Sequence, residues 1–326
     1  MKQKKLEKIL IIGLGSMGKK YLKIINKNWP ELEIAVLTSN SKYIHENYNK
    51  KILIFESLDQ AIEFRPSAAI VASPAPFHIS QALFLSQFKI PTLIEKPLGT
   101  GKESIKDIKE INYQSKKNII LVGYVLRHSP CATYIKKILS KNSLGKLIEA
   151  DFHCGSWLPS WRKGIDYTKT VSAKSYLGGG VLLEMSHEID LALLFLNDLE
   201  IKYVYKKNSG LLEIDKELED TAIIIARKNN VCVTIRLNFC TNPSERKITF
   251  RGEEGELCWD ILKNRVILSK PNSQKIYKSD MNIQDLYVLQ LEHFFSCINN
   301  QKLPICNIND GLKVLNLILE AKDFSI

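Results

Sequence analysis

The chain has 326 residues, of which 45% are hydrophobic and 25% charged, a composition typical of a globular protein with two domains. The formal net charge is +11, but the lysines are spread along the chain without a basic, aromatic stripe, and no apolar segment is long enough for a membrane, so we expect neither nucleic acid nor membrane as a partner. The seven cysteines are scattered without metal-ligand spacing, which predicts no metal site, no disulfide framework and a cytoplasmic location.

Residues 8–125 alternate short apolar segments with helical patterns. The expected strands are 9–12, 34–37, 52–55, 68–72, 92–94 and 119–122, and the expected helices are 16–28, 58–64, 77–88 and 104–115. Apolar strands that alternate with helices predict an α/β fold, with a parallel sheet covered on both faces.

From about residue 146 the pattern changes to successive strands of alternating polarity. The expected strands are 146–156, 201–207, 221–226, 231–239, 247–251, 256–261 and 266–268, and the expected helices are about 130–140, 181–196, 284–299 and 310–322. This pattern predicts an antiparallel sheet with two different faces, and a division into domains 1–125 and 126–326. The irregular segment 157–177 is long for a connection, and long loops are often functional.

Gly13, Gly15 and Gly18 follow the first expected strand and open a helix. In this context the first glycine permits a tight turn, the second lets a pyrophosphate approach the backbone, and the third lets helix and strand pack closely. Ser16 and Met17 lie at the helix N-terminus, where unpaired N–H groups face phosphates. The segment therefore predicts a dinucleotide site, and the positive net charge either favours such anions or reflects a lysine-rich proteome.

The end of the second strand is expected to hold the adenosine ribose. Thr38 and Ser39 stand there, followed by Asn40, Ser41 and Lys42, without an Asp or Glu. A carboxylate would bind the ribose 2′-hydroxyl and repel a 2′-phosphate, whereas hydroxyls and a lysine can receive a phosphate. We therefore expect NADP rather than NAD, with NAD as the open alternative.

Glu95-Lys96-Pro97 ends an apolar run that predicts a buried strand. Ligands of an open parallel sheet bind outside the carboxyl ends of its strands. Lys96 beside a dinucleotide is therefore a candidate proton donor.

With these motifs, the segment from Gly178 to Asp190 resembles the glycine-rich turn and catalytic-histidine helix of the Gfo/Idh/MocA family of oxidoreductases. Val71-Ala-Ser-Pro74 with His78, Gly123–Arg127 and the final Asn309-Asp-Gly also resemble family positions, so the resemblance covers essentially the whole chain. It implies a Rossmann domain followed by an open, mostly antiparallel sheet in a C-terminal α+β domain. It also implies oxidation or reduction of a sugar or cyclitol with NAD or NADP, and a homodimer or homotetramer formed through the C-terminal sheet.

The resemblance implies that Lys96 and His187 handle the proton, and that the Lys96–Pro97 bond is cis. It adds Ser73, Pro74, His78, Glu95 and Lys96 to the cofactor-binding residues. It places Trp161 and Arg162 beside the nicotinamide or substrate, and assigns sugar contacts to Asp166, Tyr167 and Arg127. A packed loop is the alternative for Trp157, Trp161 and Tyr167.

One departure concerns the aspartate that the family usually has four residues before the histidine. Position 183 is leucine, and the acid is Glu184. On a single helix Glu184, His187 and Asp190 would lie along one side. Glu184 is then expected to orient a substrate hydroxyl or the imidazole, and Asp190 to bind substrate or brace His187.

The segment from Trp157 to Tyr167 is similar to a family branch of bacterial surface-sugar pathways, which suggests a nucleotide sugar or a nonulosonic acid as substrate. Three alternatives stay open: a glycosidase that uses transient oxidation by a tightly held cofactor, a non-catalytic cofactor-sensing protein, and a dehydrogenase of non-sugar substrates such as dihydrodiols.

Overall fold

The computed structural model describes residues 6–39, 42–48, 52–103 and 105–325. The chain divides into a first unit, Met1–Tyr124 with Tyr287–Leu312, and a second unit, Val125–Leu286 with Lys313–Ile326. The first boundary lies between Tyr124 and Val125, and residues 287–312 return to the first unit. They pack there because Phe295 meets Trp29 edge to face at 5.0 Å, and because Gly311 lies against Val122.

The first unit contains a six-stranded parallel sheet, which confirms the predicted α/β class. Its strands are β1 (Lys8–Ile12), β2 (Glu33–Leu37), β3 (Leu53–Phe55), β4 (Ala68–Val71), β5 (Thr92–Ile94) and β6 (Ile120–Val122). Their order is β3-β2-β1-β4-β5-β6, so the direction of winding reverses between β1 and β4. Ligands of such sheets bind at this reversal, outside the carboxyl ends of the strands.

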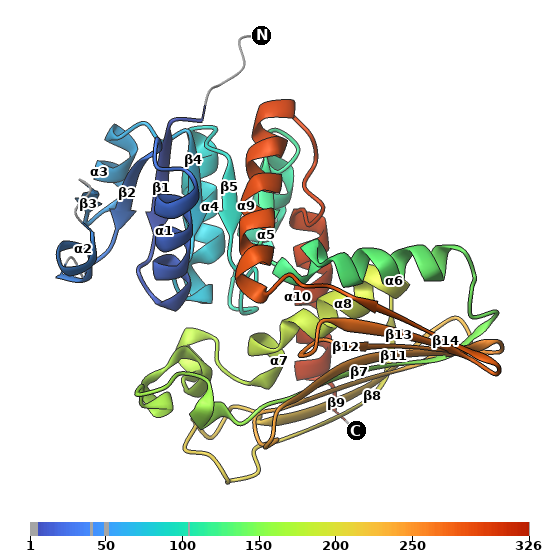
Figure 1. Cartoon of the computed structure of the whole chain (residues 1–326). Helices are drawn as coiled ribbons and strands as arrows, with labels where there is room; N and C mark the ends of the chain where they lie inside the picture. The colour runs from blue at the N-terminus through green and yellow to red at the C-terminus, as the bar shows by residue number, and fades with distance from the viewer. Residues whose placement is uncertain (1–5, 40–41, 49–51, 104, 326) are drawn as a thin grey trace. The chain divides into compact units, whose positions relative to one another are not determined.

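Helices pack around this sheet (Figure 1). They are α1 (Ser16–Asn28), α2 (Lys42–Asn47), α3 (Leu58–Glu63), α4 (His78–Gln87) after the short η1 (Ala75–Phe77), α5 (Ile105–Gln114) and α9 (Ile283–Asn300). Helix α1 has the predicted bounds, and it buries Tyr21, Leu22 and Ile25. The short and polar α2 was not predicted, because a six-residue helix offers no clear apolar period.

The second unit contains an eight-stranded sheet in the order β14-β13-β12-β11-β7-β10-β9-β8. The strands are β7 (Leu147–Gly155), β8 (Glu200–Lys207), β9 (Thr221–Lys228), β10 (Val231–Asn238), β11 (Glu245–Gly252), β12 (Gly255–Asp260), β13 (Arg265–Lys270) and β14 (Ser273–Lys278). The β7–β10 pair is parallel and the other described pairs are antiparallel, which confirms the mostly antiparallel sheet. The edge strand β14 was not predicted, because its polar sequence has little alternation.

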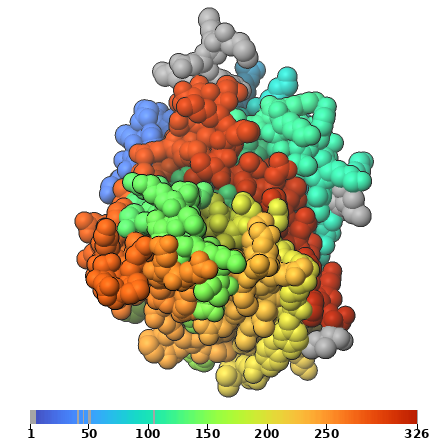
Figure 2. Space-filling model, turned by 90° about the vertical axis from the view of Figure 1, so that its right-hand side faces the viewer, coloured from blue at the N-terminus to red at the C-terminus, as the bar shows by residue number. Residues whose placement is uncertain are grey.

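Helices cover one face of this sheet, where α6 (Pro130–Ser140) and α8 (Ser186–Leu196) lie on the same side (Figure 1). In Figure 2 the green residues of α6 lie beside the orange residues of β13 and β14, and the rings of Tyr134 and Tyr277 stack there at 4.5 Å. Strand β10 buries Val233 and Ile235 on the helix side and exposes Arg236 on the other, as its alternation predicted. The last helix, α10 (Ile308–Asp323), is shared by the two units.

The predicted irregular segment 157–177 contains only short turns of helix, namely η3 (Leu158–Ser160), η4 (Tyr167–Lys169), η5 (Val171–Ala173) and η6 (Ser175–Leu177). The other short elements of the second unit are η2 (Val125–His128) and α7 (Val181–Glu184). Thus the helix expected over 181–196 is divided into α7 and α8.

Candidate active site

The glycine turn between β1 and α1 has three different local requirements. Gly13 has a φ of +90°, and a Cβ added to it would lie 2.7 Å from the backbone nitrogen of Ser73. A Cβ on Gly18 would collide with the carbonyl oxygen of Gly13, whereas a Cβ on Gly15 would have no atom within 4 Å. The first and third glycines are therefore required by packing, and the second leaves open space beside the backbone.

This open space fits a pyrophosphate. Helix α1 begins at Ser16, and no described side chain caps its N-terminus at Gly15. Ser16 is exposed, and Met17 accepts a weak hydrogen bond from the Tyr287 hydroxyl at 3.9 Å. N–H groups of the first turn thus face the space that Gly15 leaves open, an arrangement that suits an anion.

The end of β2 carries the residues expected at the ribose. The backbone N–H of Thr38 donates to Phe55, and the neighbouring Ser39 is exposed. Asn40 and Ser41 lie outside the described residues. Lys42 opens α2 and pairs with Glu46 at 3.7 Å, while the Lys19 ammonium lies 4.0 Å from the centre of the Tyr43 ring. Two lysines, Lys19 and Lys42, thus lie in this region together with the carboxylate of Glu46.

His78 is one of the residues expected at the cofactor. Its ring is 1% exposed, and both ring nitrogens contact the protein itself. Nδ1 lies 2.8 Å from the carbonyl oxygen of Pro97, and Nε2 lies 2.8 Å from that of Ser73. Burial lowers the pKa of His78, an effect that the two carbonyl contacts oppose. Ser73 and Pro74 are half-buried, and the Ser73 hydroxyl donates to Gln81 at 2.6 Å.

Lys96 stands directly after β5, and its side chain is half-buried. The Lys96–Pro97 bond is cis, as expected. Glu95, also expected at the cofactor, is 4% exposed and accepts a 2.5 Å hydrogen bond from the Tyr21 hydroxyl. Its other oxygen accepts from the backbone N–H of Lys96 at 3.2 Å. Glu95 therefore supports the backbone below Lys96 from inside the first unit.

The glycine-rich turn of the second unit precedes α7. Gly178 and Gly180 have φ values of 85° and 93°, in the left-handed region that favours glycine. A Cβ on Gly180 would lie 2.7 Å from Glu219, whose carboxylate accepts from the backbone N–H of Leu182 at 3.0 Å. Glu219 thus caps the first turn of α7, a role that its place before β9 did not reveal.

The stripe expected along one helix is corrected by a break at Met185. The backbone there leaves the helical region, with a φ of −97° and a ψ of 26°. Glu184 ends α7, where it accepts a 2.6 Å hydrogen bond from the buried Ser172 hydroxyl, and His187 lies half-buried in the first turn of α8. The two side chains therefore belong to two helical turns that meet at a corner.

Asp190 and Arg127, both expected at the substrate, form a buried pair with each other. The Asp190 carboxylate is bound by Arg127 through contacts of 2.7 to 3.1 Å, and the two side chains are 1% and 4% exposed. A bidentate buried pair of this kind anchors α8 to η2. Glu188 is anchored similarly, by a 2.6 Å contact with Arg246 of β11. His187 is thus carried on a helix that buried ion pairs hold on both sides.

The expected sugar contacts of segment 157–177 take part in local structure. The Trp161 indole donates to Ser156 at 2.9 Å and lies edge to face on Phe239. Asp166 is exposed and accepts from Thr168, whose hydrogen bonds lower the pKa of that carboxyl. The Tyr167 hydroxyl accepts from the backbone of residue 213 at 3.0 Å, and Arg162 is half-buried. These contacts support the packed-loop alternative for Trp161 and Tyr167, and Arg162 is one of several cations of the loop.

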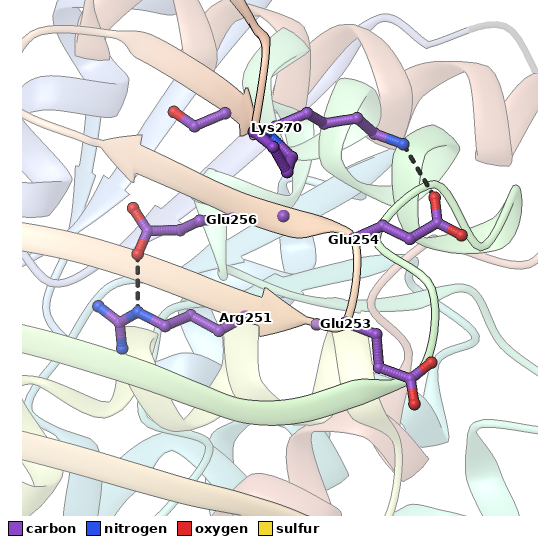
Figure 3. A pocket seen from close by; sticks show the side chains of 9 residues that line it. Arg251, Glu253, Glu254, Glu256 and Lys270 are labelled. Atoms are coloured by element: carbon purple, nitrogen blue, oxygen red, sulfur yellow. Dashed lines mark hydrogen bonds and ion pairs between the residues drawn. The ribbon is translucent and has the colours of Figure 1, made fainter.

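A separate concavity lies at the β11–β12 hairpin and has a volume of about 400 Å³ (Figure 3). Four of its five charged side chains are paired, Arg251 with Glu256 at 2.7 Å and Lys270 with Glu254 at 3.0 Å. It shares no residue with the expected site, and we assign it no function.

Three further features concern metal ligands, disulfides and membrane-spanning helices. In the described part of the chain, no three His, Cys, Asp or Glu side chains converge as metal ligands. All seven cysteines are free thiols. Within the same residues, no helix has both the length and the apolar character that crossing a bilayer requires.

The structure thus gathers the glycine turn, Ser73, His78 and Lys96 at one edge of the parallel sheet, and Glu184 and His187 at the α7–α8 corner of the second unit. Residues that sequence reasoning missed are the supporting ones: Tyr21, Gln290, Ser172, Glu188, Glu219 and Arg246. No short motif marks them, because each acts through a partner far away in the chain.

Comparison with known proteins matches both parts of the chain to one family. Residues 7–124 match the model described as "Oxidoreductase family, NAD-binding Rossmann fold", and residues 136–321 match "Oxidoreductase family, C-terminal alpha/beta domain". Among curated relatives, inositol 2-dehydrogenase of Rhodococcus erythropolis is 28% identical over 60% of this chain and 54% of its own length. The match thus spans about half of that relative.

Solved structures show the same fold. Myo-inositol 2-dehydrogenase from Lactobacillus plantarum has a TM-score of 0.80 at 18% identity, covering 98% of this chain and 96% of that one. The WlbA dehydrogenase from Bordetella pertussis, in complex with NADH and UDP-GlcNAcA, has a TM-score of 0.77 at 19% identity, covering 97% and 95%. With family models matched over residues 7–124 and 136–321, this chain belongs to the Gfo/Idh/MocA family of oxidoreductases.

Proposed function

We propose that this protein is a nicotinamide-dependent dehydrogenase or reductase that acts on a CH–OH or keto carbon of a sugar or sugar derivative. The observation that carries the proposal is the position of Lys96 relative to the glycine turn. Both follow strands of one parallel sheet, β5 and β1, and only β4 separates these strands. The two strand ends are therefore about 10 Å apart, a distance that a bound dinucleotide spans.

In this proposal Lys96 and His187 manage the proton of the reacting hydroxyl. A bound nicotinamide nucleotide supplies or accepts the hydride. The Lys96 ammonium stabilises the developing charge on the substrate oxygen. The His187 imidazole exchanges the hydroxyl proton with that oxygen. Glu184, held by Ser172, orients a neighbouring hydroxyl, and Arg162, a half-buried cation of the loop, borders the substrate.

The substrate class is supported by the named relatives. The curated relative is an inositol 2-dehydrogenase, and one structural neighbour binds UDP-GlcNAcA together with NADH. A net charge of +11 and Arg162 in the loop favour an anionic substrate. We therefore propose a nucleotide sugar or an acidic sugar ahead of a neutral cyclitol, in surface-polysaccharide biosynthesis in the cytoplasm.

The cofactor that we propose is NADP in preference to NAD. The family model describes NAD binding, so NAD is the established reference. The preference for NADP rests on Thr38 and Ser39, which lack a carboxylate, and on the basic groups Lys19 and Lys42 nearby.

A second copy of the chain is the partner that we propose for the uncovered face of the eight-stranded sheet. One row of outward side chains crosses this face from β8 to β14: Tyr203, Ile225, Thr234, Asp151, Thr249, Cys258, Ile267 and Ile276. Most are apolar or uncharged, and the face can thus pack on its own copy as a homodimer or, with further contacts, a homotetramer.

Two substitutions test the function. Lys96→Met and His187→Asn remove the proton-handling groups, and each is expected to lower kcat by about 10² to 10⁴. The Kd values for NADH and NADPH, measured by fluorescence titration, should stay within about threefold, because neither group belongs to the glycine turn. The wild type should bind NADPH more tightly than NADH.

Turnover is followed by nicotinamide absorbance with UDP-sugars, nonulosonic acids and inositols. Lys102→Met, an exposed lysine in the same segment, is the control and should retain wild-type turnover. Unchanged turnover in both active-site variants would refute the roles of Lys96 and His187.

A further inference from the structure

The buried His78 ring joins two loops at the carboxyl edge of the parallel sheet. It stands at the first residue of α4, and each of its nitrogens lies 2.8 Å from a backbone carbonyl oxygen. One carbonyl belongs to Ser73, in the loop after β4, and the other to Pro97, in the loop after β5. Carbonyl oxygens only accept, so a neutral ring donates to one of them and a charged ring donates to both.

Both carbonyls belong to residues that touch functional groups. Ser73 is the residue on which the glycine turn rests, since the Cβ position of Gly13 lies 2.7 Å from its backbone nitrogen. Pro97 directly follows Lys96. A continuous series of contacts therefore runs from Gly13 through Ser73, His78 and Pro97 to Lys96, all within the first unit.

From these contacts we propose that His78 is a positioning residue, which ties the two loops together and holds Lys96 at a fixed distance from the glycine turn. The proposal rests on the proposed function, in which Lys96 is catalytic. Misplacement of a catalytic group by about 1 Å can cost roughly a hundredfold in rate. A buried side chain that bonds to the residue next to Lys96 is well placed to prevent such a shift.

The two contacts can be separated by substitution. The amide nitrogen of Asn takes the place of Nδ1, so His78→Asn supplies a donor to Pro97 and none to Ser73. The amide nitrogen of Gln takes the place of Nε2, so His78→Gln supplies a donor to Ser73 and none to Pro97. If His78 only stabilised the fold, the two variants would have similar kcat values. If His78 positions Lys96 through Pro97, kcat should fall further in His78→Gln than in His78→Asn.

The first measurement is turnover, with Lys96→Met beside the two His78 variants. We expect kcat to fall roughly a hundredfold in His78→Gln and only a few-fold in His78→Asn, with little change in KM. In the Lys96→Met background, His78→Gln should cause no further loss, because it acts through Lys96.

The second measurement does not depend on turnover. An amine-directed reagent is applied to each variant, and labelling of Lys96 is followed by mass spectrometry. Labelling should be several-fold faster in His78→Gln than in His78→Asn or the wild type, while labelling of the exposed Lys102 stays constant.

The outcomes are distinguishable. If Lys96→Met abolishes turnover but the two His78 variants turn over equally, the positioning role is overturned and the proposed function stands. If Lys96→Met retains turnover, the role that the proposed function gives to Lys96 fails, and the catalytic part of the inference fails with it. Equal labelling of Lys96 in both His78 variants would show that the contact between His78 and Pro97 does not hold Lys96 in place.

Discussion

Glu95 shows how a charged residue in a short motif can be structural. Its carboxyl is 4% exposed, and its described neighbours include the Tyr21 hydroxyl at 2.5 Å and the Lys96 backbone N–H. Burial raises the pKa of Glu95, and the hydrogen bond from Tyr21 opposes this rise. The Tyr21 hydroxyl also lies 3.0 Å from Gln290 of α9, so this small network joins α1, β5 and α9.

The raised pKa has a definite effect on stability. Because Glu95 holds its proton more tightly in the folded state, its protonation stabilises the fold below the unfolded pKa of about 4.3. That contribution is lost as pH rises through the folded pKa. The free energy of unfolding of the wild type should therefore contain a contribution that decreases between pH 4.5 and pH 7.5. In Glu95→Gln this decrease should be smaller, as measured by urea denaturation at both pH values.

Tyr21→Phe is the matching change on the donor side. It leaves the Glu95 carboxylate without one of its donors, and should lower the free energy of unfolding by about 1 to 3 kcal/mol at pH 7.5. The loss should be smaller at pH 4.5, where more of the carboxyl is protonated than at pH 7.5. The exposed Tyr176→Phe is the control, with a change within about 0.5 kcal/mol. An equal loss at both pH values would show that Tyr21 does not act through the charge of Glu95.

At the scale of elements, the turn from β1 to α1 uses its glycines in different ways. Gly18 touches the backbone of Gly13 so closely that α1 could not keep its position with a larger residue. Gly15 has open space around it and an ordinary φ of −72°. The same motif thus contains one glycine for the fold and one for the ligand.

Alanine substitutions should separate these two roles. Gly18→Ala should lower the free energy of unfolding by about 1 to 3 kcal/mol, because the added methyl group overpacks the turn. Gly15→Ala should leave stability unchanged and raise the Kd for NADH or NADPH about tenfold or more, equivalent to about 1.4 kcal/mol. Urea denaturation and fluorescence titration measure the two effects. A Gly15 variant that binds as well as the wild type would exclude close approach of the pyrophosphate at that residue.

At the scale of the whole molecule, the face of the eight-stranded sheet opposite its helices is the surface that we propose for contact with a second copy. Ile225 lies in the outward row and is 37% exposed. If a second copy covers this face, Ile225→Glu places a charge in the interface and should reduce the assembly to single chains of 37.2 kDa. Light scattering after size exclusion measures the mass.

The control for this experiment is Leu303→Glu. Leu303 is 74% exposed and belongs to the first unit, so this change should leave the assembly intact. A wild-type protein that runs as a single chain would contradict the proposed homo-oligomer.

Local sequence determined the parts of this protein that depend on neighbours in the chain. The apolar runs predicted all six strands of the parallel sheet, the glycine spacing predicted the turn before α1, and Glu95-Lys96-Pro97 was predicted at the end of β5. These features could be predicted because periodicity and turn chemistry act over a few residues.

Only the tertiary structure decided which polar side chains are open and which are occupied. The partners of His78, Asp190 and Glu95 are 19, 63 and 74 residues away in the chain, and no local pattern records such contacts. The cap on α7 likewise comes from Glu219, 37 residues away from Leu182, whose backbone N–H donates to it. Residue type therefore identified the candidates, while burial and distant hydrogen bonds determined which of them support the site from within.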